Sequence, residues 1–176
     1  MIKTTLFKHV LSKYVNPIFV ETGTADGGGV KTAIECGFER IYSIEINQDK
    51  QLRNLERFRG IKNVTLVNGD SIEELERLIP IIDMPATFWL DAHLTKRYKG
   101  AKTRCPLYQE LEIIKTSPIK DHTIMIDDMR VVGKETWGKL VKHEEIIEHI
   151  LAINPNYKIS FEDNTMAEND IMVVQI

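Results

Sequence analysis

The segment from residue 18 to 29, IFVETGTADGGG, constrains the fold more than any other part of this chain. Three apolar residues, Ile18, Phe19 and Val20, lead into an acid, Glu21, and then into a glycine-rich turn before an amphipathic segment begins. This is the pattern of a strand that turns sharply into a helix. Glycines let a ligand approach the main chain, and the free N–H groups of the helix suit a polar or anionic group. The pattern predicts a nucleotide-type cofactor site, although such turns also join strands to helices without any ligand.

Length and composition are those of one ordinary globular domain over residues 1–176. The chain is 43% hydrophobic and 28% charged, and its net charge of −3 gives no general attraction to nucleic acid or to anionic lipid. No apolar run is typical of a membrane span or a signal peptide, so no membrane partner is expected. The two cysteines have neither metal-ligand nor disulfide spacing. A cytoplasmic location is therefore predicted.

Beyond the glycine turn, strand-like runs alternate with helix-like segments. Strands are expected at 41–46, 64–68, 86–90 and 123–126. Five helices are expected, and each has an apolar face that should turn toward the sheet. In chain order these faces are Val30, Ala33, Ile34 and Phe38; Leu52, Leu55 and Phe58; Leu75, Leu78 and Ile79; Leu107, Leu111 and Ile114; and, in a helix over about 137–153, Leu140, Ile147, Ile150 and Leu151. Gly37 is expected to end the first of them, Asn47 to cap the second, and Ser71 with Glu74 to form a capping box for the third.

The end of the chain completes the predicted fold. The segments 157–161 and 171–176 should pair antiparallel, because no helix lies between them to provide a parallel crossover. The whole pattern predicts a Rossmann-like, doubly wound α/β fold with a seven-stranded, mostly parallel sheet, one antiparallel strand at the C-terminus and helices on both faces. Residues 1–16 are expected to form a short N-terminal cap helix.

Every expected parallel strand ends in an acidic residue. These acids are Glu21, Glu45, Asp70, Asp91 and the pair Asp127 and Asp128. The carboxyl ends of parallel strands meet at one edge of the sheet, which is where open α/β sheets bind ligands. A single acid at a strand end can be a helix cap or a turn residue. A row of them at one edge would repel one another unless a ligand or a cation neutralises them.

Residues 21–27, ETGTADG, resemble the first motif of class I S-adenosylmethionine-dependent methyltransferases, with Ala25 where the middle glycine is usual. Glu45 matches that family's ribose-binding acid, and Asp70, followed by Ser71, matches its adenine-binding position. The resemblance extends over about residues 17–176. It implies that S-adenosylmethionine is bound by Glu21, Thr22, Gly23, Thr24, Ala25, Gly27, Glu45, Ile46, Asp70, Ser71 and Asp91.

A narrower resemblance concerns the segments WLDAH (89–93) and MIDDMR (125–130). They resemble the metal-binding segments of O-methyltransferases of the macrocin and catechol type, which implies a divalent cation held by Asp91, Asp127 and Asp128. Clustered carboxylates suit a hard ion such as Mg²⁺. The cation would hold an acceptor hydroxyl, lower its pKa and orient it. In the alternative, Asp127 or Asp128 caps the loop and Asp91 faces only the cofactor.

His93 stands where several macrocin-type enzymes carry a carboxylate general base. Imidazole is suited to removing a hydroxyl proton near neutral pH, so His93 and Asp91 are the candidate catalytic residues. His93 could equally be a metal ligand or a structural residue. Glu110 could join the metal shell, but a solvated position on its helix is the favoured expectation.

A basic loop follows the strand expected at 86–90. Its cations are Lys96, Arg97, Lys99, Lys102 and Arg104. The loop is either a solvated surface segment or a clamp for an anionic acceptor, such as a phosphorylated or nucleotide-linked sugar. One basic patch without an aromatic platform argues against nucleic acid. The short segment before residue 18 leaves open a bulky acceptor or a site completed by a second copy of the chain.

The main functional prediction is therefore an S-adenosylmethionine-dependent methyltransferase that transfers a methyl group, with help from a metal, to a hydroxyl of a small molecule or sugar. An NAD-dependent oxidoreductase is an alternative, because Gly23, Ala25 and Gly28 also fit a degenerate dinucleotide fingerprint and Glu45 suits a ribose there too. Such enzymes usually need a further substrate domain. The other alternative is a cofactor-binding module without catalytic activity.

Overall fold

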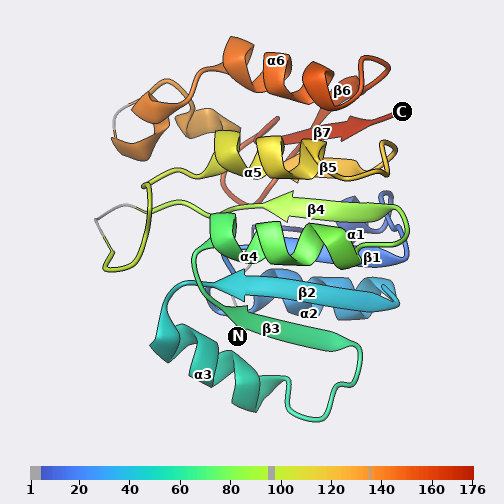
Figure 1. The fold of residues 1–176 in the computed structure, drawn as a ribbon, viewed down its shortest axis with the longest axis vertical. Coiled ribbons are helices and arrows are strands. Elements are labelled where there is room, and N and C mark those ends of the chain that lie inside the picture. Colours follow the sequence, from blue (N-terminus) through green and yellow to red (C-terminus); the bar gives the residue numbers. More distant parts are fainter. Residues whose placement is uncertain (1–4, 95–97, 135) are drawn as a thin grey trace.

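The computed structural model describes residues 5–94, 98–134 and 136–176, and these form an α/β fold around one seven-stranded sheet (Figure 1). The strands are β1 (Ile18–Thr22), β2 (Arg40–Glu45), β3 (Val64–Asn68), β4 (Ala86–Leu90), β5 (Thr123–Ile126), β6 (Lys158–Glu162) and β7 (Ile171–Gln175). Their order in the sheet is β3-β2-β1-β4-β5-β7-β6, and β7 runs antiparallel to both of its neighbours. The predicted Rossmann-like fold is confirmed, and its strand order reverses between β1 and β4.

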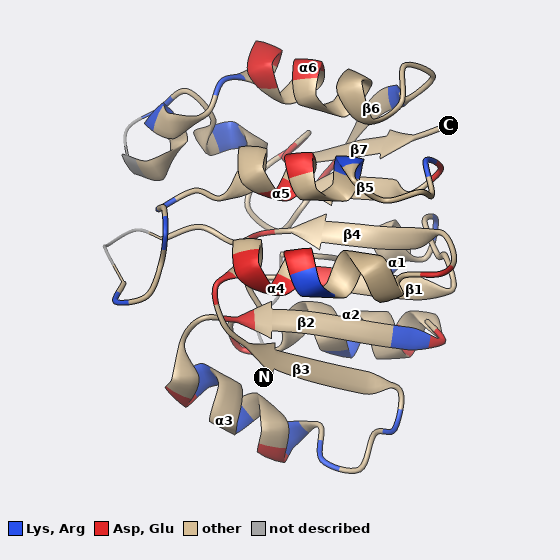
Figure 2. Cartoon of the chain, in the orientation of Figure 1, with Lys and Arg blue, Asp and Glu red and all other residues tan. Residues whose placement is uncertain are grey.

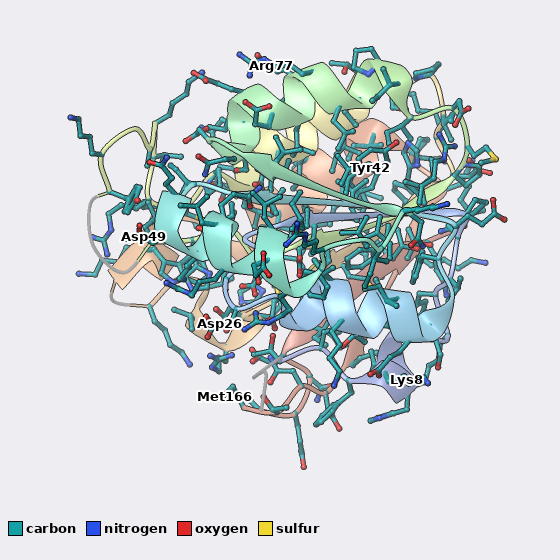
Figure 3. All side chains as sticks on the ribbon, turned by 90° about the horizontal axis from the view of Figure 1, so that it is seen from below. Lys8, Asp26, Tyr42, Asp49, Arg77 and Met166 are labelled. Atoms are coloured by element: carbon teal, nitrogen blue, oxygen red, sulfur yellow. The ribbon has the colours of Figure 1, made fainter. Side chains whose placement is uncertain are left out.

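Helices cover both faces of the sheet. They are α1 (Lys8–Leu11), α2 (Gly28–Cys36), α3 (Gln48–Arg57), α4 (Ser71–Leu78), α5 (Leu107–Lys115) and α6 (His143–Ile153), with shorter 3₁₀ turns η1 (Ile79–Ile81), η2 (Met129–Val131) and η3 (Thr136–Leu140). In Figure 1, α4, α5 and α6 lie on the near face and α1 and α2 on the far face. Lys8 of α1 and Arg77 of α4 consequently mark opposite sides of the molecule in Figure 3. Among the helices of the described residues, none has the length and apolar character that crossing a bilayer requires.

The core consists of two apolar clusters, one on each face of the sheet. Successive residues of β4 alternate between them, with Phe88 and Leu90 in one cluster and Trp89 in the other. Strands β1, β4 and β5 are buried along their whole length, as continuous apolar strands covered on both faces should be. This burial fixes the strand ends, and therefore the acids that follow them, at one edge.

Local signals place several of the helix boundaries. Gly37 adopts φ +82° and ends α2 as a left-handed C-cap, as predicted. Asn47 caps α3 by accepting a hydrogen bond from the Lys50 N–H at 3.0 Å. The predicted capping box of α4 is wrong by one position. Asp70, which precedes Ser71, is the N-cap, because its extended backbone lets Oδ1 accept the Ile72 N–H at 3.1 Å.

The inner face of α3 differs from the prediction. Leu52 and Leu55 are exposed, with 57% and 47% of their surface accessible, whereas Gln51 and Asn54 are buried. Phe58 is buried as expected. Asn54 Nδ2 donates to the Ala25 carbonyl oxygen at 2.9 Å, so the buried side of this helix combines a polar contact with the glycine turn and the apolar side chain of Phe58.

The last helix is shorter than predicted. It begins at His143, and the residues before it form η3. A Cβ at Gly138 would lie 1.9 Å from the Val131 carbonyl oxygen, so this close approach, which only glycine allows, interrupts a continuous helix. Leu140 and Leu151 are exposed, and the buried residues of α6 are Ile146, Ile150 and Ile153. Of the predicted N-terminal cap segment, residues 1–4 lie outside the described residues, and the helix in the described part is Lys8–Leu11.

Candidate cofactor and metal site

A pocket opens at the edge of the sheet where β1, β2, β3 and β4 end. The space between its side chains is about 770 Å³ when the part open to solvent is included. The pocket lies at the reversal of strand order, the usual ligand position in open α/β sheets. Figure 2 shows acidic colour at the tip of β2 on this edge. The predicted site residues that line it are Gly23, Ala25, Glu45, Ile46, Asp70, Ser71, Asp91 and His93.

Gly23 brings the first turn into contact with the end of β4. It has φ +88°, and a Cβ there would lie 2.6 Å from the Asp91 carbonyl oxygen. The Gly23 and Thr24 N–H groups both donate to the Ile44 carbonyl oxygen, at 2.9 and 3.1 Å. The turn is therefore fixed between β2 and β4, and only glycine fits its closest point.

Ala25 also has a left-handed backbone, with φ +46°. Such a conformation costs an alanine about 1–2 kcal/mol. Its N–H donates to Glu45 Oε2 at 2.8 Å, and its carbonyl oxygen accepts from Asn54. These two hydrogen bonds stabilise the conformation of the turn, although alanine stands where glycine is usual.

Glu45 is the best-fixed carboxylate of the pocket. Oε2 accepts from Ala25, Oε1 accepts the Asn47 N–H at 2.8 Å, and only 5% of the residue is exposed. Each oxygen keeps a further lone pair, so the group can accept hydrogen bonds from two ligand hydroxyls. Asp70 is engaged differently, because Oδ2 accepts the Lys102 N–H at 3.0 Å and so connects the start of α4 to the basic loop.

The remaining motif residues lie beneath the pocket and do not line it. Glu21, Thr22 and Thr24 are buried, and Gly27 forms the left-handed N-cap of α2. Thr24 Oγ1 contacts Ser43 Oγ at 2.6 Å, and the Ser43 hydroxyl in turn donates to Glu21. Burial raises the pKa of Glu21 to about 8. These residues support the turn from below.

Three side chains converge beside the pocket: Asp91, His93 and Asp128. One ligand atom of each lies within 4.8 Å of the others. His93 Nδ1 is 3.5 Å from Asp91 Oδ1, and His93 Nε2 is 3.3 Å from Asp128 Oδ2. The imidazole stacks on Trp137 with ring centroids 4.4 Å apart. The edge of the sheet therefore carries a compact set of metal-type ligands.

The protonation states of His93 and Asp91 determine which hydrogen bonds these side chains can form. Burial lowers the pKa of His93 to about 4, so its imidazole is neutral near neutral pH and has one N–H for two carboxylates. Burial, followed by the charges of Asp127 and Asp128, raises the pKa of Asp91 well above its usual range. One ring nitrogen thus faces a carboxylate as acceptor against acceptor. A proton or a cation between them resolves this contact.

Asp127 is held away from the converging set. Its Oδ2 accepts from Thr5 Oγ1 at 2.6 Å, and its Oδ1 accepts from Asn164 Nδ2 at 2.7 Å. It belongs instead to a second acidic group with Asp128 and Asp170, in which Arg130 pairs with the latter two acids. The predicted triad is therefore brought together only in part, and His93 takes the place expected for Asp127.

Two further expectations concern Glu110 and the basic loop. Glu110 is buried at 1% exposure, so the favoured solvated position is wrong. Lys96 and Arg97 lie outside the described residues. In the rest of the loop, Lys99 is exposed, Lys102 Nζ lies 3.1 Å from Glu73 Oε1, and Arg104 Nε donates to the Leu94 carbonyl oxygen at 3.1 Å.

Sequence reasoning missed several residues of the site. Those lining the pocket are Ile44, Lys50, Gly69, Ala92, Leu94, Ala101, Thr103 and Pro106. Arg130, Asn164 and Asp170 were also missed, although Asp170 carried a usable signal. Because β7 is antiparallel, its first residue lies at the same edge as the last residues of the parallel strands, and an acid just before it reaches that edge.

Comparisons with known proteins identify the fold. No protein-family model matches the chain, and no curated protein matches its sequence. SMU.1697c from Streptococcus mutans, a proposed methyltransferase in complex with SAH, is 11% identical with a TM-score of 0.64 over 99% of both chains. A structure from Staphylococcus aureus assigned as a caffeoyl-CoA O-methyltransferase is 14% identical with a TM-score of 0.58, covering 96% of this chain and 79% of that one. An rRNA methylase from Streptococcus thermophilus is 16% identical with a TM-score of 0.55, covering 99% and 96%.

The class that these likenesses define is the fold of S-adenosylmethionine-dependent methyltransferases. The chain shares this fold along nearly its whole length with proteins whose names indicate different acceptors. At such low identities the likeness is one of fold. It gives no support to the oxidoreductase alternative.

Proposed function

We propose that this protein is an S-adenosylmethionine-dependent methyltransferase that binds its cofactor in the pocket at the ends of β1 to β4. The observation that carries the proposal is Glu45. Its two oxygens are fixed by the N–H groups of Ala25 and Asn47 directly beside the glycine turn, so the carboxylate is preorganised to accept two ribose hydroxyls. The fold shared with an SAH complex supports this proposal.

The chain's own residues would position the cofactor and exclude water. The main chain from Gly23 to Ala25 would contact the amino-acid part, and Asp70 with Ser71 would face the adenine. Bound S-adenosylmethionine supplies an activated methyl group on its sulfonium. Catalysis then depends mainly on orientation at the border formed by Asp91 and His93, where the pocket meets the convergent acids.

We also propose that Asp91, His93 and Asp128 hold a divalent cation, and that methyl transfer goes to a hydroxyl. The donor set fits such an ion, because the three side chains converge and the neutral imidazole of His93 has a single N–H for the two carboxylates that face it. The set mixes carboxylate oxygens with an imidazole nitrogen, which suits Mn²⁺ better than Mg²⁺, because Mg²⁺ prefers oxygen ligands alone. When bound, the cation would lower the pKa of an acceptor hydroxyl. The low pKa of His93 makes it a weak base, which favours the role of ligand.

The acceptor is proposed to be a small molecule or a sugar. A cytoplasmic location, an anionic part of the acceptor contacted by the basic loop, and a homo-oligomer remain predictions.

Thermal unfolding tests the proposal without knowledge of the acceptor. A ligand present at about 100 times its Kd stabilises the native state by about 2.7 kcal/mol, so SAH should raise the melting temperature by several degrees. Mn²⁺ should raise it independently, and Asp128→Asn should abolish the Mn²⁺ effect while keeping the SAH effect. An unchanged melting temperature with SAH would oppose cofactor binding, and an Mn²⁺ effect that survives in the variant would oppose the metal assignment.

A further inference from the structure

Two acidic groups at the edge of the sheet share one residue, Asp128. The first is the convergent set of Asp91, His93 and Asp128, and the second consists of Asp127, Asp128 and Asp170. Asp128 is buried and has a left-handed backbone with φ +62°. Outside glycine this conformation is uncommon, and it persists where the surrounding structure imposes it, often at functional sites. The contacts of Asp128 therefore determine which of the two groups its side chain serves.

The second group is supplied with donors by the protein itself. Asp127 uses both of its oxygens for Thr5 and Asn164. Asp170 Oδ1 accepts the Arg130 N–H at 2.7 Å. Asp170 Oδ2 accepts from the Arg130 guanidinium and, at 2.7 Å, from Asn164 Nδ2. Each carboxylate oxygen of Asp127 and Asp170 thus has a donor, and the guanidinium places a positive charge among the acids.

The two oxygens of Asp128 point to different partners. Oδ1 pairs with Arg130 Nη1, and Oδ2 lies 3.3 Å from His93 Nε2. Because a carboxylate is planar and rigid, fixing Oδ1 also fixes the direction of Oδ2. Burial raises the pKa of Asp128, and the charge of Arg130 opposes that rise, which favours the ionised form that a metal ligand needs. Arg130 thus acts on the convergent set through Asp128.

Asp170 fixes Arg130 at both ends of the residue. The backbone N–H of Arg130 and its guanidinium donate to this one carboxylate, and Asp170 is 0% exposed. The Met129 N–H also donates to the Asp170 carbonyl oxygen at 3.0 Å, so the turn after β5 is bonded to the residue that precedes β7. A long and flexible side chain is thereby fixed at its charged end, as a residue that orients another one requires.

We propose that Arg130, held by Asp170, is a positioning residue that directs Asp128 Oδ2 toward His93 and the metal set. This inference rests on the proposed function, because it concerns how the chain orients a ligand of its proposed metal site. Altering a residue that orients a metal ligand typically lowers metal affinity by about 10- to 100-fold. Arg130 and Asp170, which are outside the convergent set, thus become determinants of its affinity for a cation.

The variant Arg130→Lys separates position from charge. Lysine keeps the positive charge, but its side chain is shorter by one bond and lacks the planar guanidinium. In a calorimetric titration of the whole protein, this variant should bind Mn²⁺ about tenfold more weakly and SAH as well as the unaltered chain. Arg59→Lys makes the same change at an exposed arginine and should alter neither affinity.

The second variant removes the residue that holds Arg130. Asp170→Asn keeps the shape of the side chain, but its NH₂ group must face a donor of Arg130, so Mn²⁺ binding should weaken roughly tenfold or more. Asp121→Asn, at an exposed acid before β5, is the matched control and should bind Mn²⁺ normally. All titrations are made at a temperature where the variants are folded, because a purely structural role would lower the melting temperature and leave the Mn²⁺ affinity of the folded protein unchanged.

The ring nitrogens of His93 report the position of Asp128 without any metal. With divalent metals chelated and the pH held constant, proton–nitrogen NMR spectra should show shifted His93 ring signals in both variants, because Asp128 Oδ2 lies against Nε2. A His93→Gln sample assigns these signals by their disappearance. Weaker Mn²⁺ binding without a shift of the His93 signals overturns the inference, because a change of position is then not involved. Unchanged Mn²⁺ affinity in either variant overturns it as well.

The same samples keep this inference apart from the proposed function. Mn²⁺ binding that is equally strong in the unaltered protein and in either variant rejects the role of Arg130 alone. An unaltered protein that binds no Mn²⁺ rejects the metal assignment, and shifted His93 signals in both variants would then still support the orientation of Asp128 by Arg130. Unshifted signals in that case reject both.

Discussion

Replacing Glu45 by glutamine tests how the cofactor pocket is built. Both carboxylate oxygens of Glu45 accept hydrogen bonds from backbone N–H groups, those of Ala25 and Asn47, each at 2.8 Å and partly buried. Glutamine has one oxygen and one NH₂ group. Whichever way the amide is turned, its NH₂ group must face a backbone N–H, donor against donor.

The size of the effect follows from these contacts. A partly buried N–H that loses its acceptor costs about 0.5–1.5 kcal/mol of folding stability, or a fall of roughly 1–6 °C in melting temperature for a chain of this size. The ribose hydroxyls also lose a charged acceptor, which costs about 1.5–3 kcal/mol of binding, or roughly a 10- to 150-fold increase in the Kd for SAH.

The assay is calorimetric titration with SAH at a temperature where both proteins are folded. The control is Glu76→Gln, the same chemical change on an exposed part of α4, which should affect neither property. A Glu45→Gln protein that binds SAH as well as the unaltered chain would refute the role of this carboxylate, whatever its melting temperature.

Three other predictions follow from the same geometry. Gly23→Ala should abolish SAH binding, because a Cβ 2.6 Å from the Asp91 carbonyl oxygen forces the turn away from β4; wild-type affinity in a titration would contradict this. Glu21 has a folded-state pKa of about 8, above its unfolded value, so the native state loses stability as pH rises from about 4.5 to 8. The Glu21→Gln variant has no carboxyl group to titrate and so lacks this loss. Its free energy of unfolding, measured in urea and compared with that of the wild type, should therefore increase by roughly 4 kcal/mol between the two ends of that pH range. A difference in unfolding free energy that stays constant with pH would show that Glu21 does not titrate there. Asp128→Asn should weaken Mn²⁺ binding at least tenfold in a direct titration, and an unchanged Mn²⁺ affinity would remove Asp128 from the metal set.

The sheet and most of the pocket could be predicted because both depend on local pattern and one topological rule. Apolar runs such as 86–90 become strands buried on both faces, and parallel strands place their ends together. That rule brought Glu45, Asp70 and Asp91 to one pocket although they are far apart in sequence. No atomic contact had to be known for this step.

The remaining features depend on contacts that sequence patterns do not encode. The buried side of α3 carries Asn54, which donates a hydrogen bond to the Ala25 carbonyl oxygen, and leaves Leu52 and Leu55 exposed. The late start of α6 depends on Gly138 touching Val131. The convergent set also differs from the one predicted. Asp127 hydrogen-bonds with Thr5 and Asn164, and His93, not Asp127, lies with Asp91 and Asp128.

The central claim is that the pocket above Gly23 and Glu45 takes the methyl-donor cofactor. The most direct measurement is a pair of matched calorimetric titrations of the unaltered protein, one with SAH and one with NAD. We expect saturable binding of SAH with one site per chain and no measurable heat of binding from NAD. Binding of NAD with none of SAH would contradict the account and restore the oxidoreductase alternative.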